Sequence, residues 1–169
     1  VQCVRPISDI SIYDLDSNKS NSLKKQLQDH TSASISVAGS IQESVNLADI
    51  ISTTTPCTSP IISLNDIKNT VHINAMGADA PGKQELDLSI LQHATIIVDD
   101  MIQASHSGEI NVPLHKDQLD ASAIRGSLGS LISGDTQLID TETITLFDST
   151  GLAAQDLALL DFCFSHSYD

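Results

Sequence analysis

The chain has 169 residues, of which 40% are apolar and 18% are charged, so it is long and apolar enough to bury the core of an ordinary globular domain. Its formal net charge of −14 argues against binding to nucleic acid or to an anionic membrane surface, because either partner requires a basic patch. The three cysteines form no C-x-x-C pair, and there is no apolar run of transmembrane length and no secretory signal, so we expect a cytoplasmic protein.

Strand and helix patterns alternate along the first part of the chain. Residues 9–14 alternate as a short strand that ends in an acidic residue, and the spacing then predicts a helix over 17–28 with Ser17 as its N-cap. A second strand, a short helix and a third strand are predicted at residues 33–37, 41–47 and 48–52. Short connections between alternating strands and helices favour parallel β–α–β units.

The stretch from Asn74 to Asp87, N-A-M-G-A-D-A-P-G-K-Q-E-L-D, is the strongest candidate for a site. A predicted strand over 70–73 leads into it, and a helix pattern begins near Leu86. Ligands of an open α/β sheet bind beyond the carboxyl ends of its strands, and glycine lets the backbone approach a ligand closely. Asp79 and Lys83 are four residues apart in this loop, so their charged groups could flank one ligand.

Four blocks in register carry a resemblance to a known family. They are this loop and the segments I-I-V-D-D at 96–100, G-E-I-N-V at 108–112 and I-T-L-F-D-S-T-G-L-A at 144–153. Together they resemble the ornithine cyclodeaminase/mu-crystallin family, and most closely its archaeal alanine dehydrogenase branch. The resemblance covers the chain from about residue 4 to about residue 158.

The resemblance implies an α/β fold with a doubly wound, Rossmann-type parallel sheet. In such a fold an acidic residue ends the second strand, about 20 residues after a G-x-G-x-x-G turn. Counting back from Asp14 passes the start of the sequence, so we expect an incomplete sheet that lacks the first strand and the Gly-rich turn. Residues 1–150 are expected to be a partial NAD-binding Rossmann domain. Residues 151–169 are expected to start a C-terminal helix that returns to a substrate and dimerisation domain.

The absent strand has a physical consequence for a fragment of this kind. That strand is central in the doubly wound order, so the strands that begin near Ser8 and Ala48 are expected to share no neighbour. Open apolar strand edges favour aggregation, and we expect the fragment alone to fold poorly and to be inactive. Gly126, Gly129 and Gly134 do not replace the Gly-rich turn, because they are expected along a helix and at its end.

The resemblance implies a catalytic role for Asp79. In the family, the aspartate of this loop lies beside the nicotinamide and the substrate carbon that bears the amino group. A carboxylate in that place can orient the substrate ammonium and move a proton to or from it or an attacking water. The structural alternative is an Asx turn in a Gly-rich loop.

NAD is the cofactor that the resemblance implies. Asp14 would accept hydrogen bonds from the adenosine ribose and repel the 2′-phosphate of NADP, unless it is an ordinary exposed aspartate at a strand end. The remaining expected cofactor contacts are Thr53, Thr55, Ala75, Met76, Lys83 and Ser149. The structural alternatives are turn chemistry for the two threonines, an exposed lysine at a helix start for Lys83, and a helix N-cap for Ser149.

The implied function is that of an NAD-dependent oxidoreductase acting on a small L-amino acid, as in oxidative deamination by an alanine dehydrogenase. One alternative is an ornithine cyclodeaminase, which converts ornithine to proline plus ammonia and regenerates NAD. Another is a mu-crystallin-like protein that binds NAD(P)H and a small ligand without catalysis. The parent protein is expected to be a homodimer with no nucleic acid, membrane or metal partner. Asp99, Asp100, Glu109 and Asn111 receive no chemical role.

Overall fold

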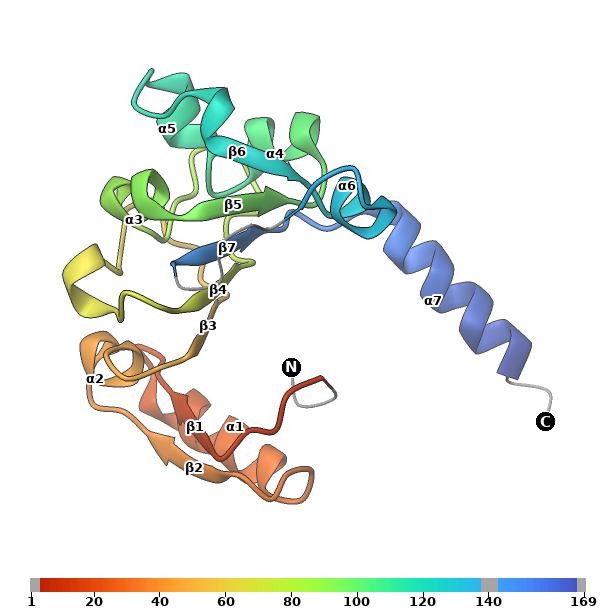
Figure 1. The fold of residues 1–169 in the computed structure, drawn as a ribbon. Coiled ribbons are helices and arrows are strands. Elements are labelled where there is room, and N and C mark those ends of the chain that lie inside the picture. Colours follow the sequence, from red (N-terminus) through yellow and green to blue (C-terminus); the bar gives the residue numbers. More distant parts are fainter. Residues whose placement is uncertain (1–3, 138–142, 167–169) are drawn as a thin grey trace. The chain divides into compact units, whose positions relative to one another are not determined.

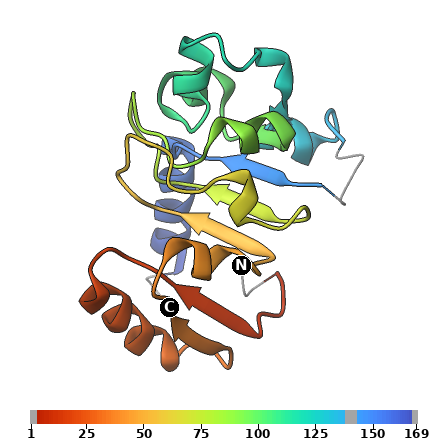
Figure 2. The ribbon, with the colours of Figure 1, turned by 90° about the vertical axis from the view of Figure 1, so that its left-hand side faces the viewer.

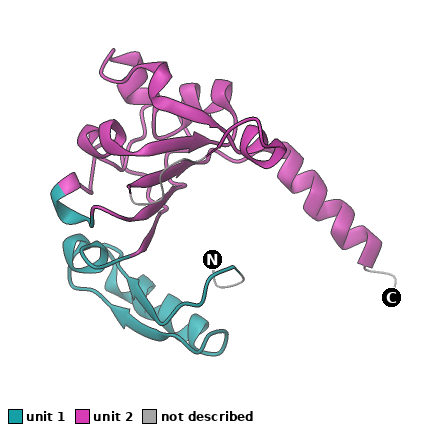
Figure 3. Ribbon diagram, in the orientation of Figure 1, with its two compact units in different colours: residues 1–48, 65–68 teal, residues 49–64, 69–169 magenta. Residues whose placement is uncertain are grey.

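The computed structural model of the chain describes residues 4–137 and 143–166, which divide into two compact units (Figures 1 and 3). Within these ranges, unit 1 takes the residues up to 48 together with 65–68, and unit 2 takes the remainder. All the predicted site residues except Asp14 belong to unit 2.

Unit 1 contains a two-stranded parallel sheet. β1 (Asp9–Ile12) pairs with β2 (Ser34–Val37), α1 (Ser17–Gln28) lies between them in the chain, and α2 (Ile41–Val45) follows β2. The helix predicted over 17–28 is confirmed, but Asp16 caps it by accepting a hydrogen bond from the N–H of Asn18 at 2.9 Å. The prediction of Ser17 as the cap is wrong, because Ser17 is already the first helical residue.

Unit 2 is built on a five-stranded parallel sheet in the order β3-β4-β7-β5-β6 (Figures 1 and 2). Its strands are β3 (Ile50–Thr53), β4 (His72–Ala75), β5 (Thr95–Val98), β6 (Ile124–Ser127) and β7 (Thr145–Asp148). The last strand in sequence therefore inserts between β4 and β5. The strand predicted over 70–73 is displaced by two residues, since its pairing with β3 and β7 continues to Ala75.

Helices and 3-10 helices follow the strands β3 to β7 along the chain, and residues 65 and 66 of the first of them belong to unit 1. They are η1 (Leu64–Asp66), α3 (Leu88–His93), α4 (Met101–Ser107), α5 (Asn111–His115), η2 (Ala121–Ala123), α6 (Leu128–Ser133) and α7 (Ala153–His166). The helix predicted after Ser149 is confirmed as α7. Throughout the described ranges, no helix combines the length and the apolar character needed to cross a bilayer.

The two sheets confirm the α/β class with parallel, Rossmann-type strand order. They also confirm that, among the described residues, no strand pairs with both the β1–β2 sheet and the sheet that contains β3.

The core of unit 2 lies on one face of its sheet. Ile73, Ile96 and Val98 point into this face and are fully buried. Their neighbours His72 and Thr95 point to the opposite face and are only half-buried, whereas Ile97 is buried on that face as well. Because side chains alternate between the faces of a strand, the buried face fixes the register and so fixes which residues lie at the strand ends.

Gly126 allows a close approach between β6 and the segment after α6. The expectation that Gly126 lies on a helix is wrong, since it belongs to β6, whereas Gly129 lies in α6 and Gly134 ends that helix with a φ of 85°. A Cβ on Gly126 would lie 2.6 Å from Thr136 Oγ1 and 2.8 Å from Ser130 Oγ. These two hydroxyls hydrogen-bond each other at 2.8 Å, so neither can move away without weakening that hydrogen bond.

We predict that Gly126→Ala lowers the free energy of unfolding of the full-length gene product by about 1–3 kcal/mol, because the added methyl group overpacks the site. Gly129→Ala is the matched control. Its Cβ would meet nothing closer than Ser127 Oγ at 3.7 Å, and alanine favours a helix by up to about 1 kcal/mol over glycine. Urea denaturation followed by circular dichroism measures both variants, and equal unfolding free energies would contradict the close approach.

Candidate active site

The carboxyl ends of β3, β4 and β7 lie side by side in unit 2. Thr53, Ala75 and Asp148 are register partners across these three strands. The backbone contacts continue beyond them, since the N–H of Met76 donates to the Thr53 carbonyl and the N–H of Ser149 donates to the Ala75 carbonyl, both at 3.0 Å. Four of the predicted cofactor contacts thus meet at one end of the sheet, where an open α/β sheet binds its ligands.

Thr53 presents a buried hydroxyl at this sheet end. Within the described part of the chain its Oγ1 is buried and has no hydrogen-bond partner. An unsatisfied buried hydroxyl is unfavourable by about 1–3 kcal/mol, but this oxygen has almost no accessible surface, so a ligand could bond to it only after a local rearrangement. Thr55 lies just beyond, half-buried, in the loop that follows β3.

Asp79 and Lys83 form an ion pair in the loop that leaves β4. The side chain of Asp79 is 59% exposed and that of Lys83 is 25% exposed. The hydrogen bond and the positive charge of Lys83 hold the pKa of Asp79 below its usual value, so the carboxylate stays ionised at neutral pH. Lys83 lies in the loop, well before α3 begins at Leu88, so the structural alternative of a lysine at a helix start is wrong, and a cofactor contact by Lys83 stays a prediction.

Glu85 fastens two loops to each other. This residue is fully buried, and its Oε1 accepts the N–H of Thr55 at 2.6 Å while its Oε2 accepts the N–H of Gly77 at 3.0 Å. A Cβ on Gly77 would collide with the Thr55 carbonyl oxygen and would lie 2.5 Å from Glu85 Cδ. One carboxylate therefore joins the loop after β3 to the loop after β4, and glycine is required at the junction.

Glu109 holds Glu85 in turn. It is also fully buried, and its Oε1 accepts the N–H of Glu85 at 2.9 Å and the N–H of Leu86 at 2.6 Å. Burial raises the pKa of Glu109 to about 8, and the nearby carboxylates of Asp148 and Glu85 add to the rise. The two backbone donors oppose that rise without cancelling it.

Asp148, at the end of β7, completes the series. Its carboxylate accepts the N–H of Glu109 at 2.9 Å and the N–H of Ile110 at 3.2 Å, and burial raises its pKa to about 7. A Cβ on Gly108 would lie 2.5 Å from Asp148 Oδ2, so only glycine lets the chain approach this closely. We call Glu85, Glu109 and Asp148 the carboxylate relay, because each of these side chains holds the backbone of the next segment.

Asp99 organises the turn that follows β7. Its Oδ2 accepts the hydroxyl of Ser149 at 3.2 Å and the N–H groups of Thr150 and Gly151 at 2.7 Å and 2.9 Å. The Ser149 hydroxyl therefore supports this turn, and α7 begins only at Ala153, so the structural alternative of a helix cap at Ser149 is wrong. A cofactor contact by Ser149 stays a prediction.

Asp14 lies in unit 1, shortly after β1. Its side chain is exposed, and Oδ1 accepts the N–H of Asp16 at 2.8 Å. This bond forms an Asx turn that leads the chain into α1. The predicted ribose contact of Asp14 stays a prediction.

The sequence did not reveal the roles of Asp99, Glu109 and Asn111. In the structure the side chain of each holds backbone groups that belong to another segment. The one signal in the sequence is that the blocks containing them also contain glycines or a strand end. In the described part of the chain, no group of three or more His, Cys, Asp or Glu residues is arranged to hold a metal ion.

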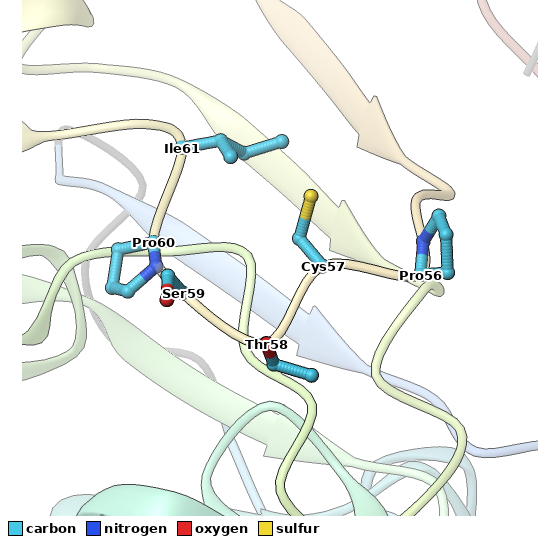
Figure 4. A pocket seen from close by; sticks show the side chains of 6 residues that line it. All are labelled: Pro56, Cys57, Thr58, Ser59, Pro60 and Ile61. Carbon is cyan, nitrogen blue, oxygen red and sulfur yellow. The ribbon is translucent and has the colours of Figure 1, made fainter.

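A separate pocket lies in the loop after β3. It has a volume of about 390 Å³ and is lined by the consecutive residues Pro56, Cys57, Thr58, Ser59, Pro60 and Ile61 (Figure 4). Neither Asp79 nor Lys83 lines it. We place the candidate site at the strand ends, because the ionised groups and the unsatisfied hydroxyl lie there.

The fold is a parallel α/β sheet with charged and small residues beyond its strand ends. This arrangement is typical of proteins that bind a ligand at that edge of the sheet. The family model for the ornithine cyclodeaminase/mu-crystallin family matches residues 1–168, and the chain belongs to that family.

Three relatives illustrate the match. The alanine dehydrogenase of Archaeoglobus fulgidus is 40% identical over 90% of this chain and 47% of its own length. The structure of an archaeal alanine dehydrogenase dimer with bound NAD superimposes with a TM-score of 0.89 at 37% identity, over 95% of this chain and 49% of that one. The Thermococcus litoralis Δ1-pyrroline-2-carboxylate reductase, in complex with NADH and L-proline, gives 0.88 at 25% identity, over 97% and 53%. The chain thus spans about half the length of these relatives.

The carboxylate relay makes stability depend on pH in a definite direction. The unfolded chain loses the Glu109 proton near an ordinary pKa of 4.5, whereas the folded chain keeps it up to about pH 8. Stability is therefore greatest below that window and falls as pH rises through it, by up to about 1.4 kcal/mol for each pH unit. We predict that Glu109→Gln, which cannot ionise, reduces this loss between pH 5 and 8, leaving the smaller part due to Asp148.

Urea denaturation of the full-length gene product at several pH values measures this effect. Glu43→Gln, on the exposed side of α2 in unit 1, is the matched control and should keep the wild-type pH dependence. The same pH dependence in Glu109→Gln and wild type would show that Glu109 is already ionised across this range.

Proposed function

We propose that the protein is an NAD-dependent oxidoreductase that removes a hydride from the amino-bearing carbon of a small L-amino acid, as an alanine dehydrogenase does. The observation that carries this proposal is the ionised Asp79 carboxylate, paired with Lys83 in the loop beyond β4. The likeness to alanine dehydrogenases over nearly the whole chain supports it.

The sheet end offers suitable contacts for a dinucleotide. Thr53 and Ala75 are register partners at the carboxyl ends of β3 and β4, and neither has a large side chain that would block a ligand there. Thr53, Thr55, Ala75, Met76 and Ser149 would hold the cofactor there. When bound, NAD would supply the hydride acceptor.

Asp79 would act on the amino group of the substrate. A substrate ammonium would compete with the Lys83 ammonium for the same carboxylate. The substrate ammonium would then supply the hydrogen bond and the positive charge that Lys83 supplies in the free protein, so Asp79 would stay ionised and would hold the amino group in place. Lys83 could then face an anionic group of the cofactor.

A second candidate is the reduction of a cyclic imine to an amino acid of the proline type. The likeness to Δ1-pyrroline-2-carboxylate reductase favours it. Both reactions move a hydride between the cofactor and the carbon that bears the nitrogen, so the same site geometry serves either direction. Within the family, ornithine cyclodeamination and non-catalytic binding of NAD(P)H are two further candidates.

We predict that the full-length gene product forms NADH from NAD and L-alanine, and that Asp79→Asn lowers kcat by roughly 100-fold or more. The expected reason is that the amide can neither balance the ammonium charge nor accept its proton. Asp120→Asn is the matched control, because Asp120 is an exposed aspartate that caps η2. The change in absorbance at the NADH band measures the rates.

Different products would distinguish the remaining candidates. Proline and ammonia formed from L-ornithine without net NADH would indicate a cyclodeaminase, and NADH consumption with Δ1-pyrroline-2-carboxylate would indicate the reductase. Tight NADH or NADPH binding with no turnover of any of these compounds would contradict a catalytic function. A wild-type rate in Asp79→Asn would contradict the role of Asp79.

A further inference from the structure

Asn111 contacts the far end of the loop that carries Asp79 and Lys83. It is the first residue of α5 and is 3% exposed. Its Oδ1 accepts the N–H of Gly82 at 3.1 Å, and its Nδ2 donates to the Lys83 carbonyl at 3.1 Å. A carboxamide carries a donor and an acceptor side by side, so this one side chain matches the N–H and C=O groups of two successive residues.

The loop is held at both ends by buried side chains. Near its start, Glu85 accepts the N–H of Gly77, and near its end Asn111 holds Gly82 and Lys83. Gly82 has a φ of 81°, so the chain turns sharply just before Lys83. The position of the Lys83 side chain relative to Asp79 therefore depends on how firmly this turn is held.

Asn111 is itself fixed by the carboxylate relay. The two residues before it, Glu109 and Ile110, donate their N–H groups to Asp148 at the end of β7. The Asn111 side chain also donates to the Gly108 carbonyl, and its own N–H donates to the same oxygen at 3.0 Å. The end of β7 is thus connected to the backbone of Lys83 by the hydrogen bonds of Asp148, the covalent chain through residues 109–111 and the hydrogen bonds of the Asn111 side chain.

We propose that Asn111 is a positioning residue that sets the distance and orientation of the Asp79–Lys83 pair for the reaction. It contacts the backbone of Gly82 and Lys83 and acts on the reacting groups only through them. This inference rests on the proposed function, since a positioning role has meaning only for an active site.

The test compares Asn111→Ala with His115→Ala in the full-length gene product. His115 is the matched control, because it lies on the exposed side of the same helix and its ring hydrogen-bonds the Asn111 carbonyl at 2.7 Å. We expect Asn111→Ala to lower kcat with the active substrate by roughly 10-fold to 100-fold, as small misplacements of reacting groups do. The KM for NAD should change far less, and His115→Ala should behave as wild type.

Limited trypsin digestion supplies a second measurement that needs no turnover. The Lys83 carbonyl held by Asn111 belongs to the peptide bond that trypsin would cut. Cleavage after Lys83 should therefore accelerate in Asn111→Ala, while cleavage after Lys116 and Arg125 stays at the wild-type rate. Asn111→Asp preserves the volume but replaces the donor with an acceptor, so it should reproduce both effects without leaving a cavity.

Wild-type kcat in both Asn111 variants, with or without faster cleavage after Lys83, would overturn the proposal. Faster cleavage at Lys83, Lys116 and Arg125 together would also overturn it, because that pattern indicates global destabilisation. If the wild-type protein turns over none of the candidate substrates, the proposed function fails and the positioning role fails with it. The trypsin rates would then still report whether Asn111 holds the loop.

Discussion

Buried carboxyl groups that accept backbone N–H groups, and do not pair with cations, hold together the loops at the carboxyl ends of the strands of unit 2. Glu85, Glu109 and Asp148 each accept at least two such donors, from segments far apart in the sequence. A buried carboxylate is unfavourable unless it is hydrogen-bonded, and a buried loop N–H is unfavourable for the same reason. Each group removes the penalty of its partner, so irregular loops can be as well fixed as the strands they leave.

The buried hydrogen bonds hold the backbone around the candidate site, whereas its charged side chains remain partly exposed. The backbones near Thr55, Gly77 and Lys83 are held by Glu85 and Asn111, whereas the side chains of Asp79 and Lys83 are at least partly exposed. A ligand could therefore separate the ion pair without rebuilding the loop. If the proposed function is correct, side chains on a backbone fixed in this way would lose little entropy when a substrate binds.

The sequence predicted the elements better than the contacts between them. The helix over 17–28 was predictable from its local pattern. The predicted bounds of β4 were two residues too early, because the end of that strand depends on its pairing with β3 and β7. The sequence pattern assigned Gly126 to a helix, because a single glycine gives no sign that its backbone packs closely against the Ser130 side chain. The relay was not predictable, since Glu109 meets Glu85 across 24 residues and meets Asp148 across 39. The resemblance located the segments of the site but left Glu109 and Asn111 without roles.

Amide hydrogen exchange of the full-length gene product tests most directly whether the carboxylate relay fixes the loops. The N–H groups of Gly77, Leu86 and Ile110 lie outside the strands but donate to Glu85, Glu109 and Asp148. We predict that they exchange as slowly as the N–H groups of the central strand β4, since a bound buried amide opens only with its surroundings. Exchange at the rate of exposed loop amides would contradict the account, because the carboxylates would then not hold these segments.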